Sequence, residues 1–226
     1  DEGWSASLAA IEAVGRAKSQ ASDAESRSPV GPAITTEHSP DLIHSFISAA
    51  EDLDASDLAA TLDQLFAISS FETVMVHHIF PALKELGDAW ADGRVTVAGE
   101  HLASNAIMRR LAVAYEAAAA FGHGPRVVLG TGPNSRHEIG LLAFAVAARR
   151  QGLNTDYLGA DLPLEDWLET TEATDISAVV LTLPTLADVA ATTRVISDLL
   201  EARPGLIIAV GGAEQDHAPH GALRLG

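Results

Sequence analysis

The sequence predicts a four-helix bundle followed by an α/β domain with a flavodoxin-like (Rossmann-like), doubly wound parallel sheet. Residues 41–122 carry apolar side chains at helical spacing in segments joined by short connections, as in a small antiparallel bundle. Residues 123–226 instead alternate short apolar runs with amphipathic segments of several turns, which is typical of strands alternating with helices. The pattern changes at Gly122-His123-Gly124-Pro125, so we expect the domain boundary there.

Local signals position the helices of the bundle. Pro81 has no N–H group and should kink or split the third helix. Asp92-Gly93 ends that helix, and the Thr96 hydroxyl can cap the next one. The predicted helices are 40–51, 55–69, 72–91 and 96–121.

The second domain is predicted to be C-terminally incomplete, because the sequence stops short of the fifth strand and final helix that usually complete such a sheet. Doubly wound sheets bind ligands beyond the carboxyl ends of their strands, at the switch point. His137, Thr182–Thr185 and Gly211-Gly212 all fall at such ends. The predicted strands are 126–130, 154–158, 176–183 and 206–210, and the helices are 138–151, 164–173 and 186–202.

Composition restricts the class of protein. Fourteen basic and 31 acidic residues give a formal net charge of −17, so most of the surface should repel nucleic acid. A role at DNA would need a separate basic domain or a partner protein. No apolar run approaches the about 18 residues of a membrane span, and the lack of cysteine excludes disulfides and thiolate metal sites. We expect a cytoplasmic protein that does not contact membranes.

Gly130-Thr131-Gly132-Pro133-Asn134-Ser135 follows a predicted strand, so a dinucleotide fingerprint has to be considered. Ser135 stands where the third glycine would be, and the next helix begins too late, near Glu138, for a tight pyrophosphate turn. NAD or FAD binding is therefore disfavoured.

His137, in the same loop, is a candidate metal ligand. A loop after a buried strand presents an imidazole away from the sheet, and a neutral imidazole is a good ligand for cobalt or iron. Its other nitrogen needs a partner to fix the tautomer, and Ser135 is a candidate. Gly140 would let a bulky ligand approach the helix. Taken alone, the loop fits a solvent-exposed histidine at a helix N-terminus somewhat better.

The segment Ser135-Arg136-His137-Glu138-Ile139-Gly140 resembles the Asp-x-His-x-x-Gly motif of cobalamin-binding domains, with serine in place of aspartate. The resemblance implies that His137 is the lower cobalt ligand and that Glu138, Ile139 and Gly140 line the cofactor. It also implies a cleft for the nucleotide tail. That cleft would be lined by Thr182, Pro184, Thr185, Gly211 and Gly212. A carboxylate at position 135 would raise the basicity of His137 more than a hydroxyl can, so we expect weaker or more switchable ligation.

Trp90, nine intervening residues and Glu100-His101 resemble the Trp-x9-Glu-His signature of light-sensing cobalamin regulators of the CarH type. The resemblance implies that Trp90 packs against the upper-face adenosyl group and that Glu100 helps to hold it. His101 would take the upper cobalt position once light has cleaved the cobalt–carbon bond. The local chemistry agrees, since tryptophan offers a flat surface to a purine and a carboxylate accepts hydrogen bonds from a ribose. Adenosylcobalamin is then expected between bundle and sheet.

Residues 1–17 resemble the last helix of a MerR-type DNA-binding domain. Residues 18–40 are rich in Ser, Ala, Pro and acidic side chains and are expected to form a linker. We therefore expect the DNA-reading part of the protein to be missing from this chain.

These resemblances imply an adenosylcobalamin-binding light sensor that regulates transcription by a change of conformation or oligomeric state, without turnover and as a homo-oligomer. A corrinoid module of a methyltransferase is the enzyme alternative. Such modules share the lower motif, but they lack the Trp-x9-Glu-His spacing and normally keep the aspartate. A cobalamin-binding antirepressor-type adaptor, with no DNA-binding domain of its own, is a third interpretation.

Overall fold

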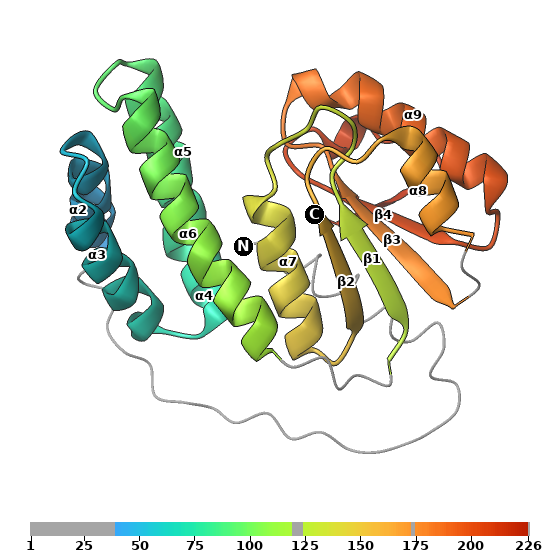
Figure 1. Ribbon diagram of the computed structural model, residues 1–226, viewed down its shortest axis with the longest axis horizontal. Helices are drawn as coiled ribbons and strands as arrows, with labels where there is room; N and C mark the ends of the chain where they lie inside the picture. Colours follow the sequence, from blue (N-terminus) through green and yellow to red (C-terminus); the bar gives the residue numbers. More distant parts are fainter. Residues whose placement is uncertain (1–38, 119–123, 173–174, 226) are drawn as a thin grey trace. The chain divides into compact units, whose positions relative to one another are not determined.

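The computed structural model describes residues 39–118, 124–172 and 175–225, so the predicted N-terminal helix and most of the linker lie outside the described residues. The described chain forms two compact units, of which one ends at Ala112 and the other begins at Val113. This division falls inside one helix, α6 (Val97–Ala117) (Figure 1).

The first unit confirms the predicted helical bundle. Asp54 caps α3 by accepting hydrogen bonds from the N–H groups of Ser56 and Asp57, and Thr96 Oγ1 accepts from Gly99 N–H at 3.1 Å, as expected for a cap of α6. Helices α6 and α2 approach each other closely at Gly99, where an added Cβ would lie 2.3 Å from Ala50 O. The elements are α2 (Ser39–Glu51), α3 (Ala55–Ile68), α4 (Phe71–Val74), η1 (Met75–Ile79), α5 (Phe80–Ala91) and α6.

Pro81 splits the third predicted helix. The chain passes from α4 into the π-helical turn η1 and then into α5, with Phe80 N–H bonded to Met75 O, five residues back. The wider turn accommodates a proline that can donate no helical hydrogen bond. His78 lies buried in this turn, and its burial, with the nearby His77, lowers its pKa.

The second unit is a five-stranded parallel sheet with strand order β2-β1-β3-β4-β5, the flavodoxin-like order. The expectation that the sequence stops short of a fifth strand is wrong, because β5 pairs in parallel with β4. Its two residues are too few to give a periodic signal in the sequence. The strands are β1 (Arg126–Gly130), β2 (Asn154–Gly159), β3 (Ile176–Thr182), β4 (Ile207–Gly211) and β5 (Leu223–Arg224).

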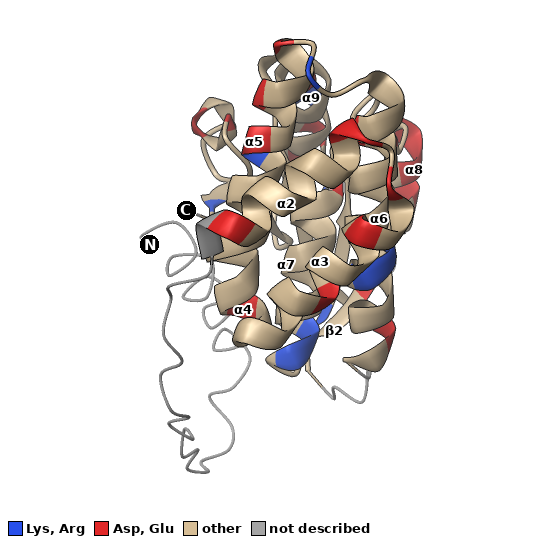
Figure 2. Cartoon of the chain, turned by 90° about the vertical axis from the view of Figure 1, so that its left-hand side faces the viewer, with Lys and Arg blue, Asp and Glu red and all other residues tan. Residues whose placement is uncertain are grey.

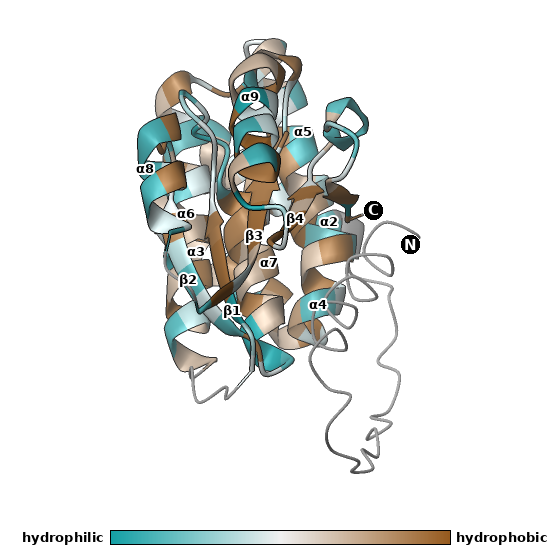
Figure 3. Cartoon of the chain, turned by 90° about the vertical axis from the view of Figure 1, so that its right-hand side faces the viewer, coloured by the Kyte–Doolittle hydropathy of each residue, from teal (hydrophilic) through white to brown (hydrophobic). Residues whose placement is uncertain are grey.

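Helices cover both faces of the sheet: α7 (Ile139–Arg150) lies on one face, and α8 (Leu164–Thr170) and α9 (Leu186–Ala202) lie on the other (Figure 1). Trp167 of α8 and Ile196 of α9 pack against strand residues such as Val179 in one buried cluster. Figure 3 shows β3 and β4 as strongly apolar, as expected of strands buried on both faces. Helix α8 is shorter than predicted, and the Thr171 hydroxyl donates back to Trp167 O at its end. Within the described ranges, no helix combines the length and apolar character needed to cross a bilayer.

Candidate functional site

The loop that carries His137 joins β1 to α7 at the carboxyl edge of the sheet. It is tied to the loop after β2 by Asp161, whose carboxylate accepts a hydrogen bond from Asn134 N–H (2.6 Å). The N–H of Asp161 donates to Thr131 Oγ1 (2.8 Å) and to Ser135 O (3.0 Å). Asn134 and Asp161 both adopt positive φ, 64° and 60°, a region that few residues other than glycine occupy. Their shared hydrogen bonds offset that strain and hold the loop in one shape.

His137 faces a carboxylate that is distant in the sequence. Its side chain is 65% exposed, and its Nδ1 lies 3.8 Å from Oδ2 of Asp188, which is 5% exposed. Asp188 belongs to the first turn of α9, where Oδ2 also accepts from the N–H (3.0 Å) and the hydroxyl (2.6 Å) of Thr185. With Nδ1 turned toward this carboxylate, Nε2 is the nitrogen left for a ligand.

Ser135 does not have its predicted role. The side chain is fully buried, and its hydroxyl has no hydrogen-bond partner among the described residues. The expected hydrogen bond to His137 is therefore not formed. Sequence reasoning missed Asp188, although Thr185-x-x-Asp188 is a capping-box pattern that marks a helix start at the carboxyl end of a strand.

Glu138, Ile139 and Gly140 follow His137 at the start of α7. The Glu138 carboxylate accepts a hydrogen bond from the Tyr157 hydroxyl of β2 at 2.5 Å. Burial, and then this hydrogen bond, raise the pKa of Tyr157 far above its usual value, so the phenol stays protonated as a donor. Ile139 is half-buried, whereas Gly140 is exposed and an added Cβ would meet no atom within 4 Å.

The two segments predicted to line a nucleotide cleft are neighbours. Thr182 pairs in register with Gly211, and Leu183 N–H donates to Gly211 O at 2.8 Å. Gly212 has φ +104°, and a Cβ there would lie 2.5 Å from Leu183 O. Gly211 has room, since its Cβ would touch only Leu225 at 3.7 Å.

Pro184 and Thr185 continue the first of these segments and are both half-buried. The Thr185 hydroxyl donates to Asp188, which leaves it only an acceptor role toward any ligand. Thr182, Pro184 and Thr185 therefore lie at the edge of the sheet, in the segment that neighbours Gly211 and Gly212.

The bundle carries the other predicted residues on the α5–α6 hairpin. Trp90 lies in the last turn of α5 and is 52% exposed. The hairpin turns tightly behind it, with Arg94 N–H and Val95 N–H both donating to Ala89 O. The exposed indole ring offers a flat apolar surface on which a ligand can stack.

Glu100 and His101 lie in the first turns of α6 and contact each other. His101 Nδ1 is 2.6 Å from Glu100 Oε2, and Ser104 Oγ donates to Glu100 Oε1 at 2.6 Å. The His101 side chain is 70% exposed. Glu100, held by Ser104, thus orients the imidazole, and its Nε2 has no hydrogen-bond partner among the described residues. Sequence reasoning did not foresee Ser104, although its spacing of four residues from Glu100 puts both on one helix face.

Both units match family models of B12-binding domains. Residues 125–226 match the family model of the B12 binding domain, and residues 42–115 match a second model also described as a B12 binding domain. The described chain is therefore a B12-binding helical cap followed by a B12-binding domain with a Rossmann-like fold.

Two curated relatives are transcriptional regulators of Myxococcus xanthus. The HTH-type transcriptional repressor CarH is 33% identical over 126 residues, which cover 54% of this chain and 40% of that protein. The HTH-type transcriptional repressor CarA is also 33% identical, over 118 residues that cover 52% of this chain and 39% of that protein. The chain thus matches about two fifths of the length of each regulator.

A solved structure shares the fold. The monomethylamine corrinoid protein of Methanosarcina barkeri superposes with a TM-score of 0.59 at 14% identity, covering 77% of this chain and 85% of that chain. The likeness agrees with the predicted fold class, a helical region followed by a parallel sheet with helices.

The residues at the carboxyl edge of the sheet fit the lower face of a corrinoid. His137 is exposed, and its Nε2 contacts no polar group in the described ranges. Gly140 leaves open space at the start of α7, and Gly211 adds no side chain beside Thr182. Cobalt accepts an imidazole nitrogen, and a nucleotide tail requires backbone that can be approached closely. The donor set therefore suits cobalamin.

Proposed function

We propose that the chain is the sensory part of an adenosylcobalamin-dependent light receptor that regulates transcription. The observation that carries the proposal is the α5–α6 hairpin of the cap, where an exposed Trp90 ends one helix and a Glu100–His101 pair begins the next. The similarity of about half of the chain to two transcriptional repressors supports the regulatory part. The receptor catalyses no turnover.

Each unit contributes one histidine whose Nδ1 faces a carboxylate. His137 is the lower ligand, with Gly140 and the Thr182–Gly211 neighbourhood receiving the rest of the cofactor. Adenosylcobalamin supplies a cobalt–carbon bond that visible light can break. Trp90 offers the stacking surface for the adenosyl group, and Glu100 helps to hold it.

In this proposal, His101 is the residue that responds to loss of the adenosyl group. Its Nδ1 is held by Glu100, so its Nε2 would be available to bind cobalt if the adenosyl group no longer covered the metal. Binding of His101 to the cofactor in one state and not in the other would bias the chain toward a second arrangement. This change alters the assembly of a homo-oligomer and, through a separate DNA-binding domain or partner, the occupancy of an operator.

A spectroscopic experiment tests the proposal. The purified chain is loaded with adenosylcobalamin in the dark, and its absorption spectrum and mass in solution are recorded before and after green light. We expect a light-exposed spectrum that differs from that of photolysed free cofactor, together with a changed mass. A spectrum identical to that of free cofactor and an unchanged mass would refute the light-receptor function.

Two variants assign the roles. His101→Ala should form the dark complex normally and give a different light-exposed spectrum, because the proposed role of the His101 Nε2 begins only after illumination. His44→Ala, which removes an exposed histidine elsewhere in the bundle, is the matched control. If His101→Ala fails to bind in the dark, the assignment of His101 is wrong. Methyl transfer from a methyl donor through the bound cofactor would instead favour a corrinoid module of a methyltransferase.

A further inference from the structure

His137 needs a group that fixes its tautomer, and Ser135 does not supply it. A histidine that ligates a metal through one nitrogen donates the N–H of the other to a carboxylate, carbonyl or water in most proteins. The Ser135 hydroxyl is buried without a partner in the part of the chain that the structure describes, and it carries no charge. The group that orients His137 must therefore come from elsewhere in the fold.

Two carboxylates of the His137 loop and its neighbouring loop are directed at groups other than the imidazole. Glu138 accepts the hydrogen bond of the Tyr157 hydroxyl, and Asp161 accepts that of Asn134 N–H. Asp188 is the carboxylate that faces the imidazole, with Oδ2 3.8 Å from Nδ1 of His137.

We propose that Asp188 is the positioning residue of His137, in the place of the carboxylate that the loop lacks at position 135. The proposal rests on the proposed function, since it treats His137 as the lower cobalt ligand. Asp188 holds the proton of the imidazole on Nδ1, which leaves the lone pair of Nε2 directed at the metal. It does so from α9, a different element from the one that carries the ligand.

Asp188 is well suited to this role because its position is fixed. The Thr185 N–H and hydroxyl both donate to Oδ2, and the first turn of α9 stabilises a negative charge. The imidazole is largely exposed, whereas the carboxylate is buried. The proposed arrangement requires the ring to move toward Asp188, so that the 3.8 Å separation shortens to the about 2.8 Å of a charge-assisted hydrogen bond.

The tautomer of His137 in the cofactor-free chain provides the test. Nitrogen-15 NMR distinguishes a protonated from an unprotonated imidazole nitrogen, and His137→Gln identifies the signals. At a pH where the ring is neutral, we expect the Nδ1–H form to predominate in the wild-type chain. Asp188→Asn should shift His137 toward the Nε2–H form. Asp198→Asn removes a carboxylate from the same helix, where it pairs with Arg194, and should leave the tautomer unchanged.

A second readout follows ligation itself. In Asp188→Asn loaded with cobalamin, we expect the spectral signature of a nitrogen bound to cobalt to weaken and the affinity to fall roughly 10- to 100-fold, the usual range when a group that orients a metal ligand is removed. Thermal unfolding of both variants separates this effect from a loss of folding.

A predominant Nε2–H tautomer in the wild-type chain would overturn the proposal, and this measurement does not depend on the folding of any variant. An unchanged tautomer in folded Asp188→Asn would overturn it as well. Since the NMR experiment uses no cofactor, a chain that holds the Nδ1–H tautomer but shows no response to light would refute the proposed function alone.

Discussion

Gly140 and Gly212 are both predicted to contact the cofactor, but the fold requires only one of them to be glycine. Gly212 has φ +104°, and a Cβ there would lie 2.5 Å from the backbone oxygen of Leu183. Any other residue would strain this turn whether or not a ligand is bound. Gly140 has an ordinary helical conformation, and a Cβ would meet no atom within 4 Å. The described part of the chain therefore imposes no need for glycine at position 140, whereas a cofactor against α7 would impose one.

This contrast predicts opposite effects of Gly140→Ala on stability and on binding. The helix should gain up to about 1 kcal/mol, because alanine is the better helix former. Cobalamin binding should weaken, because the added methyl group occupies the space next to the ligand. Urea unfolding and a cofactor titration measure the two effects.

The matched control is Gly87→Ala, which adds a methyl group to an open position of α5. This variant should raise the free energy of unfolding without weakening cobalamin binding. If Gly140→Ala binds cobalamin as tightly as the wild-type chain does, the cofactor does not approach α7 at this residue.

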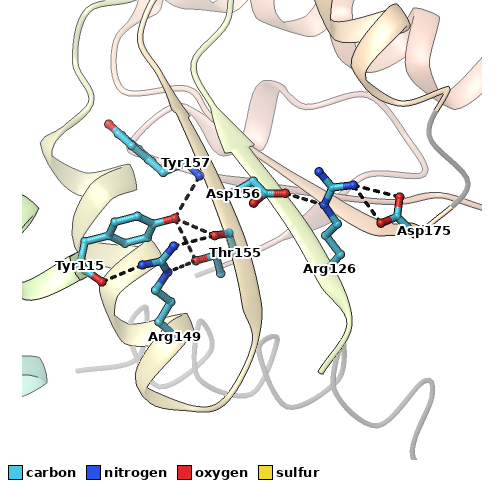
Figure 4. Close-up of polar contacts among 7 residues, drawn as sticks. All are labelled: Tyr115, Arg126, Arg149, Thr155, Asp156, Tyr157 and Asp175. Atoms are coloured by element: carbon cyan, nitrogen blue, oxygen red, sulfur yellow. Dashed lines mark hydrogen bonds and ion pairs between the residues drawn. The ribbon is translucent and has the colours of Figure 1, made fainter. Parts of the chain in front are cut away.

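At the scale of elements, β2 is the edge strand of the sheet, and side chains cover part of its free edge (Figure 4). Tyr115, in the last turn of α6, donates from its hydroxyl to Thr155 O (2.7 Å) and accepts from Tyr157 N–H (3.1 Å). Arg149 of α7 lies 3.4 Å over the Tyr115 ring and also donates to Thr155 O. The tyrosine thus makes the two bonds that another strand would make, which blocks pairing with a second chain at this point.

Tyr115→Phe should expose this edge. The substitution keeps the ring but leaves Tyr157 N–H without an acceptor, at a cost of about 1–3 kcal/mol. We expect a lower free energy of unfolding and faster hydrogen exchange of the Tyr157 amide. Tyr157→Phe, which removes the hydroxyl that contacts Glu138, should leave this amide protected. Equal exchange in Tyr115→Phe and the wild-type chain would show that the hydroxyl does not protect the edge.

The sequence predicted the elements with regular patterns and missed contacts between distant residues. Apolar periodicity, Pro81 and the Thr96 cap sufficed to place the helices and the long strands, since each signal lies within the element that it specifies. The Asp188–His137 pair depends on the sheet order, which brings the ends of β1 and β3 together. The π-helical form of η1 and the two-residue strand β5 leave no periodic signal of their own.

For the whole molecule, the charge distribution limits what this chain can bind. The formal net charge is −17, and the view in Figure 2 shows acidic residues on α5, α6 and α8 and few basic ones. Several basic residues of the described part are paired with acidic ones. Arg126, for example, donates to both Asp156 and Asp175. Such a surface releases few counterions from DNA, and non-specific affinity is correspondingly low.

We therefore predict that the chain alone does not bind duplex DNA, either in the dark with adenosylcobalamin or after illumination. Fluorescence anisotropy of a labelled duplex at low salt measures this, because low salt favours any electrostatic binding. A rise in anisotropy that is abolished by added salt would reveal a basic surface and would contradict the prediction. A fusion to a basic DNA-binding domain is the positive control.

The tie between the loops after β1 and β2 also has a thermodynamic consequence. Asp161 fixes Asn134 and the backbone around Ser135, so the conformational entropy of the loop is lost when the protein folds and not when a ligand arrives. Ordering a flexible loop costs roughly 1–2 kcal/mol per residue. Because the segment that presents His137 is already ordered, ligand association should proceed without a slow rearrangement of this loop.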